Sequence, residues 1–251
     1  MSPAKDERLQ VVLARFGLAS RRGVVSLIES GKVTVNGEEV LEKGFRVKPG
    51  DKISVEGKEL STDRPEEKRY FVLNKPKGVM TTMQDPHAEH TVADFFQSVP
   101  ERLFPVGRLD RDTTGLLMMT NDGALAFALT HPKFGVKKKY FAKVRGSVTD
   151  EVVKRLEKGV QLEEGMTAPC KIEIIHREPK ETELHVILHE GKKRQIRRIF
   201  DKAGYRVQEL TRLSYGTLSL GDLKPGRIRE LTEQEVAALK KVTKPSGASK
   251  L

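Results

Sequence analysis

The segment GRLDRDTTG, residues 107–115, places one carboxylate, Asp110, between two arginines and just before a long apolar run. A second acid, Asp112, completes an Asp-x-Asp pair of the kind that can hold a divalent metal. Arg108 and Arg111 would repel such an ion, and no nearby His or Glu completes a ligand set. We therefore expect no metal at this segment.

Two other roles for Asp110 stay open on the residues alone. A glycosidase needs carboxylates on opposite sides of a sugar, and a spacing of two in a loop does not establish that geometry. For an isolated aspartate in a loop, the simpler role is an ion pair with a neighbouring arginine.

The chain is strongly basic, and its charge is concentrated. It has 251 residues, with 46 Lys and Arg against 35 Asp and Glu, a formal net charge of +11. Residues 191–212 hold eight basic side chains against two acids, and residues 133–145 hold six with no acid. Two such stretches in one domain can line a channel that follows phosphates. Aromatic residues are only 6% of the chain with no Trp, which favours a folded RNA over an extended single strand. The alternative is an ordinary solvated basic surface.

The cysteine content and the N-terminus bear on the compartment. Cys170 is the single cysteine, so it has no partner for an intramolecular disulfide or a cysteine zinc site. The opening residues lack the apolar core of a signal peptide, and no stretch approaches the length of a membrane span. We expect a cytoplasmic protein without a membrane partner.

Residues 1–60 are predicted to form a compact module. Apolar residues at helical spacing run from Leu9 to Phe16, and Ser20 is placed to cap a second helix that ends before Gly31. The segment KVTVNGEEV alternates into a turn at 36–37, and FRVKPGDKISVEG predicts two strands around a turn at 49–50.

Residues 69–240 are predicted to form a second domain, after a polar linker at 61–68 and before a flexible tail at 241–251. Four segments are typical of strands: YFVLN, GLLMMTN, KYFAKVRG and TELHVILHE. Helices are expected in NDGALAFALTH, in EVVKRLEKGV and around VAALKK. Ile196, Ile199 and Phe200 lie at helical spacing, which predicts an amphipathic helix with a basic outer face that stops at Gly204. The pattern favours an α+β fold.

The segment GRLDRDTTGLLMMTNDG resembles the active-site segment of pseudouridine synthases, in particular the bacterial ribosomal RNA family that includes small-subunit synthase A and large-subunit synthase B. NKPKGVMTT, FPVGRLD, HPKFGVKKKY and EGKKRQIRRIF occur in this family's order, so the resemblance spans about 70–231. Residues 8–40 resemble the alpha-L RNA-binding module that precedes the catalytic domain in this family. The resemblance implies a small alpha-L module followed by a catalytic domain with a mixed, largely antiparallel sheet and a central cleft.

Such enzymes isomerise a uridine already in RNA to pseudouridine and need no cofactor or metal. By its match, Asp110 is the catalytic carboxylate, which acts once the target base has been flipped out of its stack. The residues do not decide whether Asp110 acts as a nucleophile or as a base. Either role requires the ionised form, which a cation within about 4–6 Å favours. The match to RQIRR assigns that cation to Arg197; the alternative is that Arg197 faces phosphate or solvent.

Two further matches concern the flipped base. Tyr140 matches the family tyrosine that stacks on it, although a tyrosine on an alternating strand is more often a core residue. Arg108 matches an arginine that helps displace the base, and a phosphate contact is an equally good role for it. Expected RNA contacts are Arg8, Arg15, Ser20, Arg21, Arg22, Lys32 and Asn36 in the first module, and Lys192, Lys193, Arg194 and Arg198 in the second domain. Asn36 serves its turn equally well.

The expected partner is ribosomal RNA, and THPKFGVKKKY with the separate first module favours the large-subunit synthase B branch. Small-subunit rRNA stays open, and a monomer is the default. The leading rival is a catalytically silent RNA-binding or ribosome-assembly factor; retention of Asp110, Tyr140 and Arg197 together argues against it. A hydrolase acting on a nucleoside or sugar would leave the basic helix and the first module without a purpose.

Overall fold

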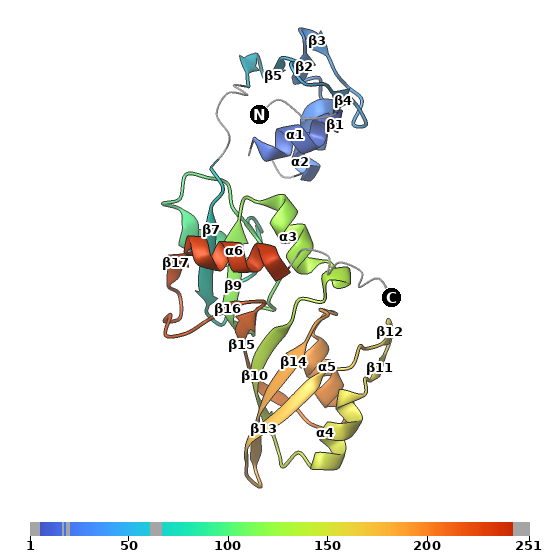
Figure 1. Cartoon of the computed structure of the whole chain (residues 1–251), viewed down its shortest axis with the longest axis vertical. Helices are drawn as coiled ribbons and strands as arrows, with labels where there is room; N and C mark the ends of the chain where they lie inside the picture. The colour runs from blue at the N-terminus through green and yellow to red at the C-terminus, as the bar shows by residue number, and fades with distance from the viewer. Residues whose placement is uncertain (1–5, 17, 19–20, 61–66, 243–251) are drawn as a thin grey trace. The chain divides into compact units, whose positions relative to one another are not determined.

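The protein forms two compact units, Met1–Lys68 and Arg69–Leu251, in a computed structural model that describes residues 6–16, 18, 21–60 and 67–242 (Figure 1). Most of the predicted linker and tail, residues 61–66 and 243–251, lies outside the described residues. The last helix runs to Val242, two residues into the predicted tail.

The first unit packs two helices on a small sheet. Its elements, in chain order, are β1 (Glu7–Arg8), α1 (Leu9–Arg15), α2 (Arg21–Glu29), β2 (Val33–Val35), β3 (Glu38–Glu39), β4 (Arg46–Val47), β5 (Ile53–Val55) and β6 (Lys58–Glu59). The four-stranded sheet has the order β3-β2-β5-β6, and β1 pairs with β4. The core joins both helices to the sheet through Leu9, Leu13, Ile28, Val33 and Ile53, all at most 1% exposed. The two strands predicted around residues 49–50 form, but β4 and β5 do not pair with each other.

The second unit is built on one long sheet. Its strands are β7 (Tyr70–Lys75), β8 (Phe104–Pro105), β9 (Thr114–Thr120), β10 (Lys138–Arg145), β13 (Lys171–Arg177), β14 (Glu181–Leu188), β15 (Val207–Tyr215), β16 (Leu218–Ser219) and β17 (Ile228–Glu230). The order is β13-β14-β10-β15-β9-β7-β17, with β16 on β15 and β8 on β9. Among the described residues, every strand pairing in this sheet is antiparallel except that of β15 with β9. The predicted α+β fold with a mixed, largely antiparallel sheet is confirmed.

Helices cover both faces of this sheet. The remaining elements are η1 (Val92–Phe96), α3 (Gly123–Thr130), η2 (Pro132–Phe134), α4 (Asp150–Glu157), the β11 (Gln161–Leu162) and β12 (Gly165–Met166) hairpin, α5 (Gln195–Lys202) and α6 (Glu233–Val242). In β9, Leu117 and Met119 join a core with α4 and α5, whereas Leu116 and Met118 join a core with α3 and α6. Because β7 and β9 are buried on both faces, each contains a continuous apolar run rather than an alternating pattern.

A glycine makes the parallel pairing of β9 and β15 possible. Gly115 has φ +99°, and a Cβ there would lie 2.4 Å from the carbonyl oxygen of Arg212. Only a residue without a side chain fits this approach. The pairing fixes the start of β9, and with it the loop that ends there.

The basic helix predicted after Gly191 is shorter than expected. It begins at Gln195, and the preceding Arg194 has φ +51°, which is not helical. Lys192, Lys193 and Arg194 therefore belong to the loop before α5. Ile196, Ile199 and Phe200 are buried as predicted.

Candidate functional site

The loop that carries Asp110 connects β8 to β9 and is held by its backbone. The Thr81 hydroxyl donates to the Leu109 carbonyl oxygen at 2.7 Å and accepts from the Leu109 N–H at 3.2 Å. The Thr113 N–H donates to the Asp110 carbonyl oxygen at 3.0 Å, which closes a turn around the acid. These bonds fix the backbone of Asp110 without engaging its carboxylate.

A buried lysine ties this loop to the end of β7. Lys75 is fully buried, and its ammonium donates to the carbonyl oxygens of Pro76 (2.9 Å), Val79 (2.8 Å) and Arg111 (3.4 Å). Burial lowers the pKa of Lys75 to about 8, and the negative charges of Asp112 and Asp110 oppose that shift. A positive charge thus lies beneath the acidic loop. Sequence reasoning missed this role, since a lysine after an apolar strand gives no sign that it is buried.

Asp110 lines a cavity of about 360 Å³, which we call the acid cavity; its other lining residues are Met80, Thr81, Arg108, Leu109, Arg111, Asp112 and Arg194. This volume lies in the range of small-ligand sites. Asp110 is half-buried and Arg108 is exposed. In the part of the chain that the structure describes, the Asp110 carboxylate makes no hydrogen bond or ion pair. It is therefore available to an occupant of the cavity.

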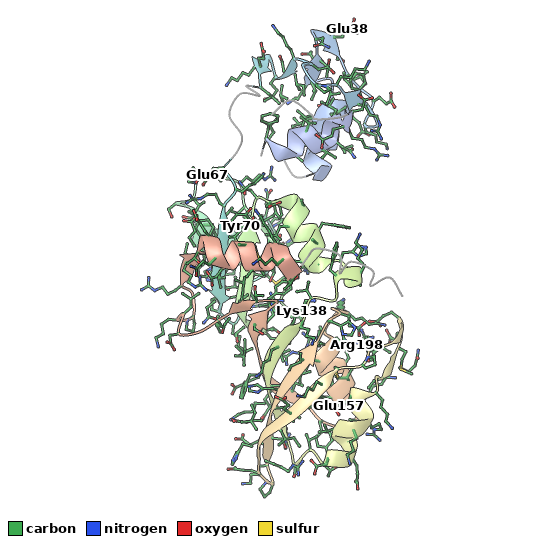
Figure 2. All side chains as sticks on the ribbon, viewed as in Figure 1. Glu38, Glu67, Tyr70, Lys138, Glu157 and Arg198 are labelled. Atoms are coloured by element: carbon green, nitrogen blue, oxygen red, sulfur yellow. The ribbon has the colours of Figure 1, made fainter. Side chains whose placement is uncertain are left out.

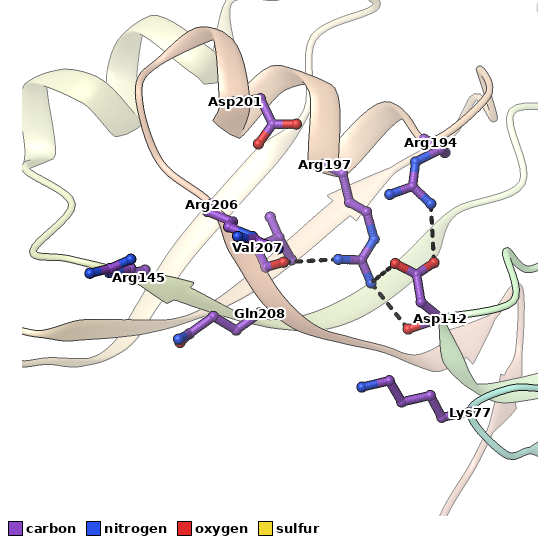
Figure 3. A pocket seen from close by; sticks show the side chains of 9 residues that line it. All are labelled: Lys77, Asp112, Arg145, Arg194, Arg197, Asp201, Arg206, Val207 and Gln208. Atoms are coloured by element: carbon purple, nitrogen blue, oxygen red, sulfur yellow. Dashed lines mark hydrogen bonds and ion pairs between the residues drawn. The ribbon is translucent and has the colours of Figure 1, made fainter.

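Arg197 was predicted to be the cation near Asp110, and its direct ion pair in the structure is with the other acid of the loop. Arg197 pairs with the Asp112 carboxylate, Nη2 to Oδ2 at 3.1 Å, and donates to the carbonyl oxygens of Asp112 (3.1 Å) and Val207 (2.9 Å) (Figure 3). Arg194 holds the same carboxylate at 3.1 Å. The physical reason is geometric: the guanidinium is clamped between the Asp112 and Val207 carbonyls, and this clamp directs it to the acid two residues beyond Asp110.

The electrostatics of this pair follow from its partial burial. Arg197 is 7% exposed, and burial lowers its pKa while the charges of Asp112 and Asp110 oppose the shift. Burial alone would raise the pKa of Asp112, but Arg197 and Arg194 outweigh it and hold that pKa below its ordinary value. Arg197 thus remains a cation near Asp110. Its side chain is buried and its direct ion pair is with Asp112, so its action on the Asp110 carboxylate stays a prediction.

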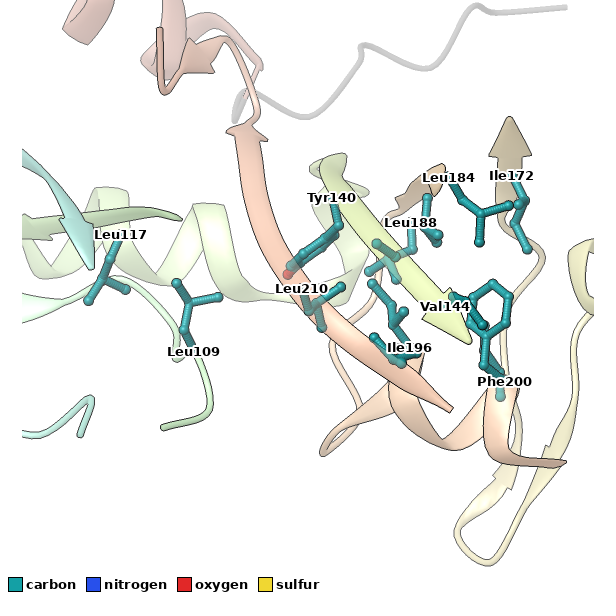
Figure 4. Close-up of a cluster of buried hydrophobic side chains, with 14 of the residues drawn as sticks. Leu109, Leu117, Tyr140, Val144, Ile172, Leu184, Leu188, Ile196, Phe200 and Leu210 are labelled. Atoms are coloured by element: carbon teal, nitrogen blue, oxygen red, sulfur yellow. The ribbon is translucent and has the colours of Figure 1, made fainter. Parts of the chain in front are cut away.

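Tyr140 lies in the core. It is 8% exposed and belongs to the same buried cluster as Leu109, Leu117, Ile196 and Leu210 (Figure 4). It does not line the acid cavity, but Leu109, a member of its cluster, does. Its stacking on a base stays a prediction.

Comparison with known proteins places this geometry in a family. A family model described as RNA pseudouridylate synthase matches residues 69–202, and an S4 domain model matches residues 7–53. The chain belongs to the RNA pseudouridylate synthase family. It is thus a pseudouridine synthase, an isomerase, and the predicted resemblance to the large-subunit synthase B type is confirmed.

Individual relatives match over nearly the whole chain. The ribosomal large subunit pseudouridine synthase B of Bacillus subtilis (strain 168) is 44% identical over 236 residues, covering 93% of this chain and 96% of the relative. An uncharacterized RNA pseudouridine synthase of Aquifex aeolicus (strain VF5) is 41% identical, covering 93% and 94%. A solved structure of a pseudouridylate synthase has a TM-score of 0.67 at 29% identity, covering 94% of this chain and all of that chain.

The predicted RNA-binding residues of the synthase unit differ in whether their side chains already have intramolecular partners. Lys193 is exposed, whereas Arg194 pairs with Asp112. Lys192 donates to the carbonyl oxygens of Gly165 (3.1 Å) and Met166 (2.9 Å). Arg198, labelled in Figure 2, holds both oxygens of Glu164 at 2.6 Å. RNA would have to displace these intramolecular partners at Lys192, Arg194 and Arg198, so Lys193 is the candidate with the fewest constraints.

In the S4 unit, too, some predicted RNA-binding residues are exposed and others already have intramolecular partners. Arg8 is exposed, whereas Lys32 pairs with Glu56 at 2.6 Å. Asn36 has φ +54°, donates to the Asp51 carboxylate and accepts from the Lys52 N–H, each at 2.9 Å, so it serves its turn. Arg15, Arg21 and Arg22 lie in the two helices, but the structure does not describe their side chains, and Ser20 lies outside the described residues.

The described residues contain neither a metal-binding cluster nor a helix that could cross a membrane. No group of three or more His, Cys, Asp or Glu within residues 6–16, 18, 21–60 and 67–242 is arranged to hold a metal ion. Within the same ranges, no helix has the length and apolar character needed to cross a membrane.

Proposed function

We propose that this synthase converts a specific uridine of large-subunit ribosomal RNA to pseudouridine, with Asp110 as the reacting carboxylate. The observation that carries the proposal is the contrast between two neighbouring acids. Asp112 is held by Arg194 and Arg197, each at 3.1 Å, whereas Asp110 lines the acid cavity with its carboxylate unengaged. An acid that serves only to pair would resemble Asp112.

The chemistry needs an anion and nothing that must be supplied from outside. The bond from C1′ to N1 breaks, a bond from C1′ to C5 forms, C5 loses a proton and N1 gains one. Nucleophilic addition and proton removal both start from an ionised carboxylate. Lys75 and Arg197 supply positive charge close to Asp110, and each is shielded from solvent. A nearby cation favours the ionised acid.

The acid cavity is the proposed place for the flipped base. A stacked uridine exposes neither C1′ nor C5 to a carboxylate, so the base must leave its stack. Arg108 lines the cavity and is exposed, which supports a role in displacing the base or in contacting a phosphate. For Tyr140 to stack on the base, its buried ring must become accessible. We therefore expect the packing around Tyr140 to change when RNA binds.

Two features support ribosomal RNA as the substrate. The Bacillus subtilis relative that is 44% identical is named a ribosomal large subunit pseudouridine synthase B. The S4 unit offers a second RNA contact, and a linked second contact raises affinity through effective concentration without altering the reacting site.

The test is release of tritium from uridine labelled at C5, measured on unmodified large-subunit and small-subunit rRNA. Wild-type protein is expected to release tritium from the large-subunit RNA alone. Release only from small-subunit RNA would overturn the assigned subunit. Tight binding without release from either RNA would favour a silent binding factor.

A further inference from the structure

A second cavity, which we call the basic cavity, lies beside the Asp110 site. Its volume is about 460 Å³, and its lining residues are Lys77, Asp112, Arg145, Arg194, Arg197, Asp201, Arg206, Val207 and Gln208 (Figure 3). Five are cationic and two are acidic, a formal surplus of three positive charges. None of the assigned roles uses this cavity as a whole.

Three of its cations have no side-chain partner among the described residues. Lys77, Arg145 and Arg206 are exposed, and within the described residues their side chains make no ion pair or hydrogen bond. Arg145 and Arg206 are brought together by the sheet, since the Arg145 N–H donates to the Arg206 carbonyl oxygen at 2.9 Å. Long cations on a convex surface are simply solvated, but these converge on one concavity from three separate segments. Such an arrangement concentrates positive potential.

The basic cavity shares a wall with the acid cavity. Asp112 and Arg194 line both. Because Asp112 is engaged by Arg194 and Arg197, its charge is largely compensated and does not repel an anion in the basic cavity. An anion bound there would lie next to the occupant of the Asp110 site.

We propose that the basic cavity binds the backbone phosphates of the nucleotides that flank the target uridine. This inference rests on the proposed function, because it takes the Asp110 site to hold that uridine. Guanidinium groups match phosphate oxygens in geometry, and the Gln208 amide adds a neutral donor. Phosphate contacts position RNA without reading its sequence, so Lys77, Arg145 and Arg206 are positioning residues for the substrate strand.

The test is the salt dependence of RNA affinity, measured in the Asp110→Asn protein so that no turnover occurs. The test variants are Arg145→Gln, Arg206→Gln and Lys77→Gln. The control is Arg155→Gln, which removes an exposed charge on α4 that lines neither cavity. The probe is unmodified large-subunit rRNA. Each lost phosphate contact should reduce the slope of log affinity against log salt by about 1 and weaken binding roughly 5- to 10-fold at 0.1 M salt.

Arg155→Gln should leave both the slope and the affinity near those of the parent, and Arg145→Gln with Arg206→Gln combined should lower the slope by about 2. Circular dichroism shows whether each variant is folded; the three positions are exposed, so we expect native spectra. Equal effects at Arg155 and in the cavity would overturn the proposal, as would weaker binding with an unchanged slope. If wild-type protein releases no tritium from rRNA, the proposed function fails, whereas the salt slopes still report on the cavity.

Discussion

Asp112→Asn is expected to destabilise the synthase unit, because it removes the carboxylate that compensates a buried arginine. The Arg197 side chain is 8% exposed and that of Asp112 is 38% exposed. Asparagine keeps the shape of aspartate but has no charge. The variant therefore isolates the charge of the pair from its packing.

The expected loss in the free energy of unfolding lies between two limits. Breaking a fully buried pair from one side costs about 3–5 kcal/mol, whereas an exposed pair contributes about 0–1 kcal/mol. Asp112 is partly exposed, and Arg197 keeps its bonds to the carbonyl oxygens of Val207 (2.9 Å) and Asp112 (3.1 Å). We expect a loss of about 2 kcal/mol, which in a unit of this size lowers Tm by roughly 4–8 °C.

Thermal unfolding at pH 7 measures the effect, with Asp201→Asn as the matched control. Asp201 is an exposed acid at the basic cavity without an ion pair in the described part of the chain, so its loss should change stability by less than about 0.5 kcal/mol.

The effect of Asp112→Asn should also depend on pH. The pKa of Asp112 in the folded protein lies below its ordinary value of 3.8. Its ionised form is therefore stabilised by folding, and this stabilisation is present above about pH 4 and is lost as pH falls through the lowered pKa. The difference in Tm between wild type and Asp112→Asn should become smaller as pH is lowered. Equal Tm values at pH 7, or a gap that widens in acid, would refute the reasoning.

Three further outcomes are expected. Gly115→Ala should yield little folded protein, because its Cβ would lie 2.4 Å from a backbone oxygen at positive φ. Gly123→Ala, which has open space at the start of α3, should be neutral or stabilising by about 0.4–1 kcal/mol. Soluble yield and Tm measure both effects. Cys170 should react with a thiol reagent at pH 8 roughly 100-fold more slowly in native than in denatured protein. The reason is that burial, together with the charges of Glu157 and Glu190, raises the pKa of its thiol to about 11. Comparable rates in the two states would contradict this. RNA affinity should fall steeply between low and moderate salt, and a flat response would count against phosphate binding.

Continuous apolar runs and turn signals were enough to predict β7, β9, α3 and α6. At the start of α6 the Glu235 N–H donates to the Thr232 hydroxyl at 3.2 Å, which caps the helix. The strand β15 was not predicted, because its register with β10 shifts twice and it buries Arg212 at 2% exposure. A buried arginine interrupts the alternation on which strand prediction depends.

Part of the candidate site was predictable from the sequence and part was not. Motif resemblance indicated Asp110 and Arg197, and the structure brings both to neighbouring positions. It did not indicate that Asp112 would hold Arg197, because two acids separated by one residue are indistinguishable until the backbone clamps the guanidinium. The basic cavity depends on Lys77, Arg145 and Arg206, which come from segments far apart in the chain. Sequence alone located two of these cations in basic stretches but not their convergence.

We assign the reaction to Asp110 and not to the paired acid two residues away. Tritium release from C5-labelled large-subunit rRNA, measured for wild type, Asp110→Asn and Asp112→Asn below their melting temperatures, tests this assignment most directly. We expect no release with Asp110→Asn despite unchanged RNA affinity, and measurable release with Asp112→Asn. Substantial release with Asp110→Asn would contradict it.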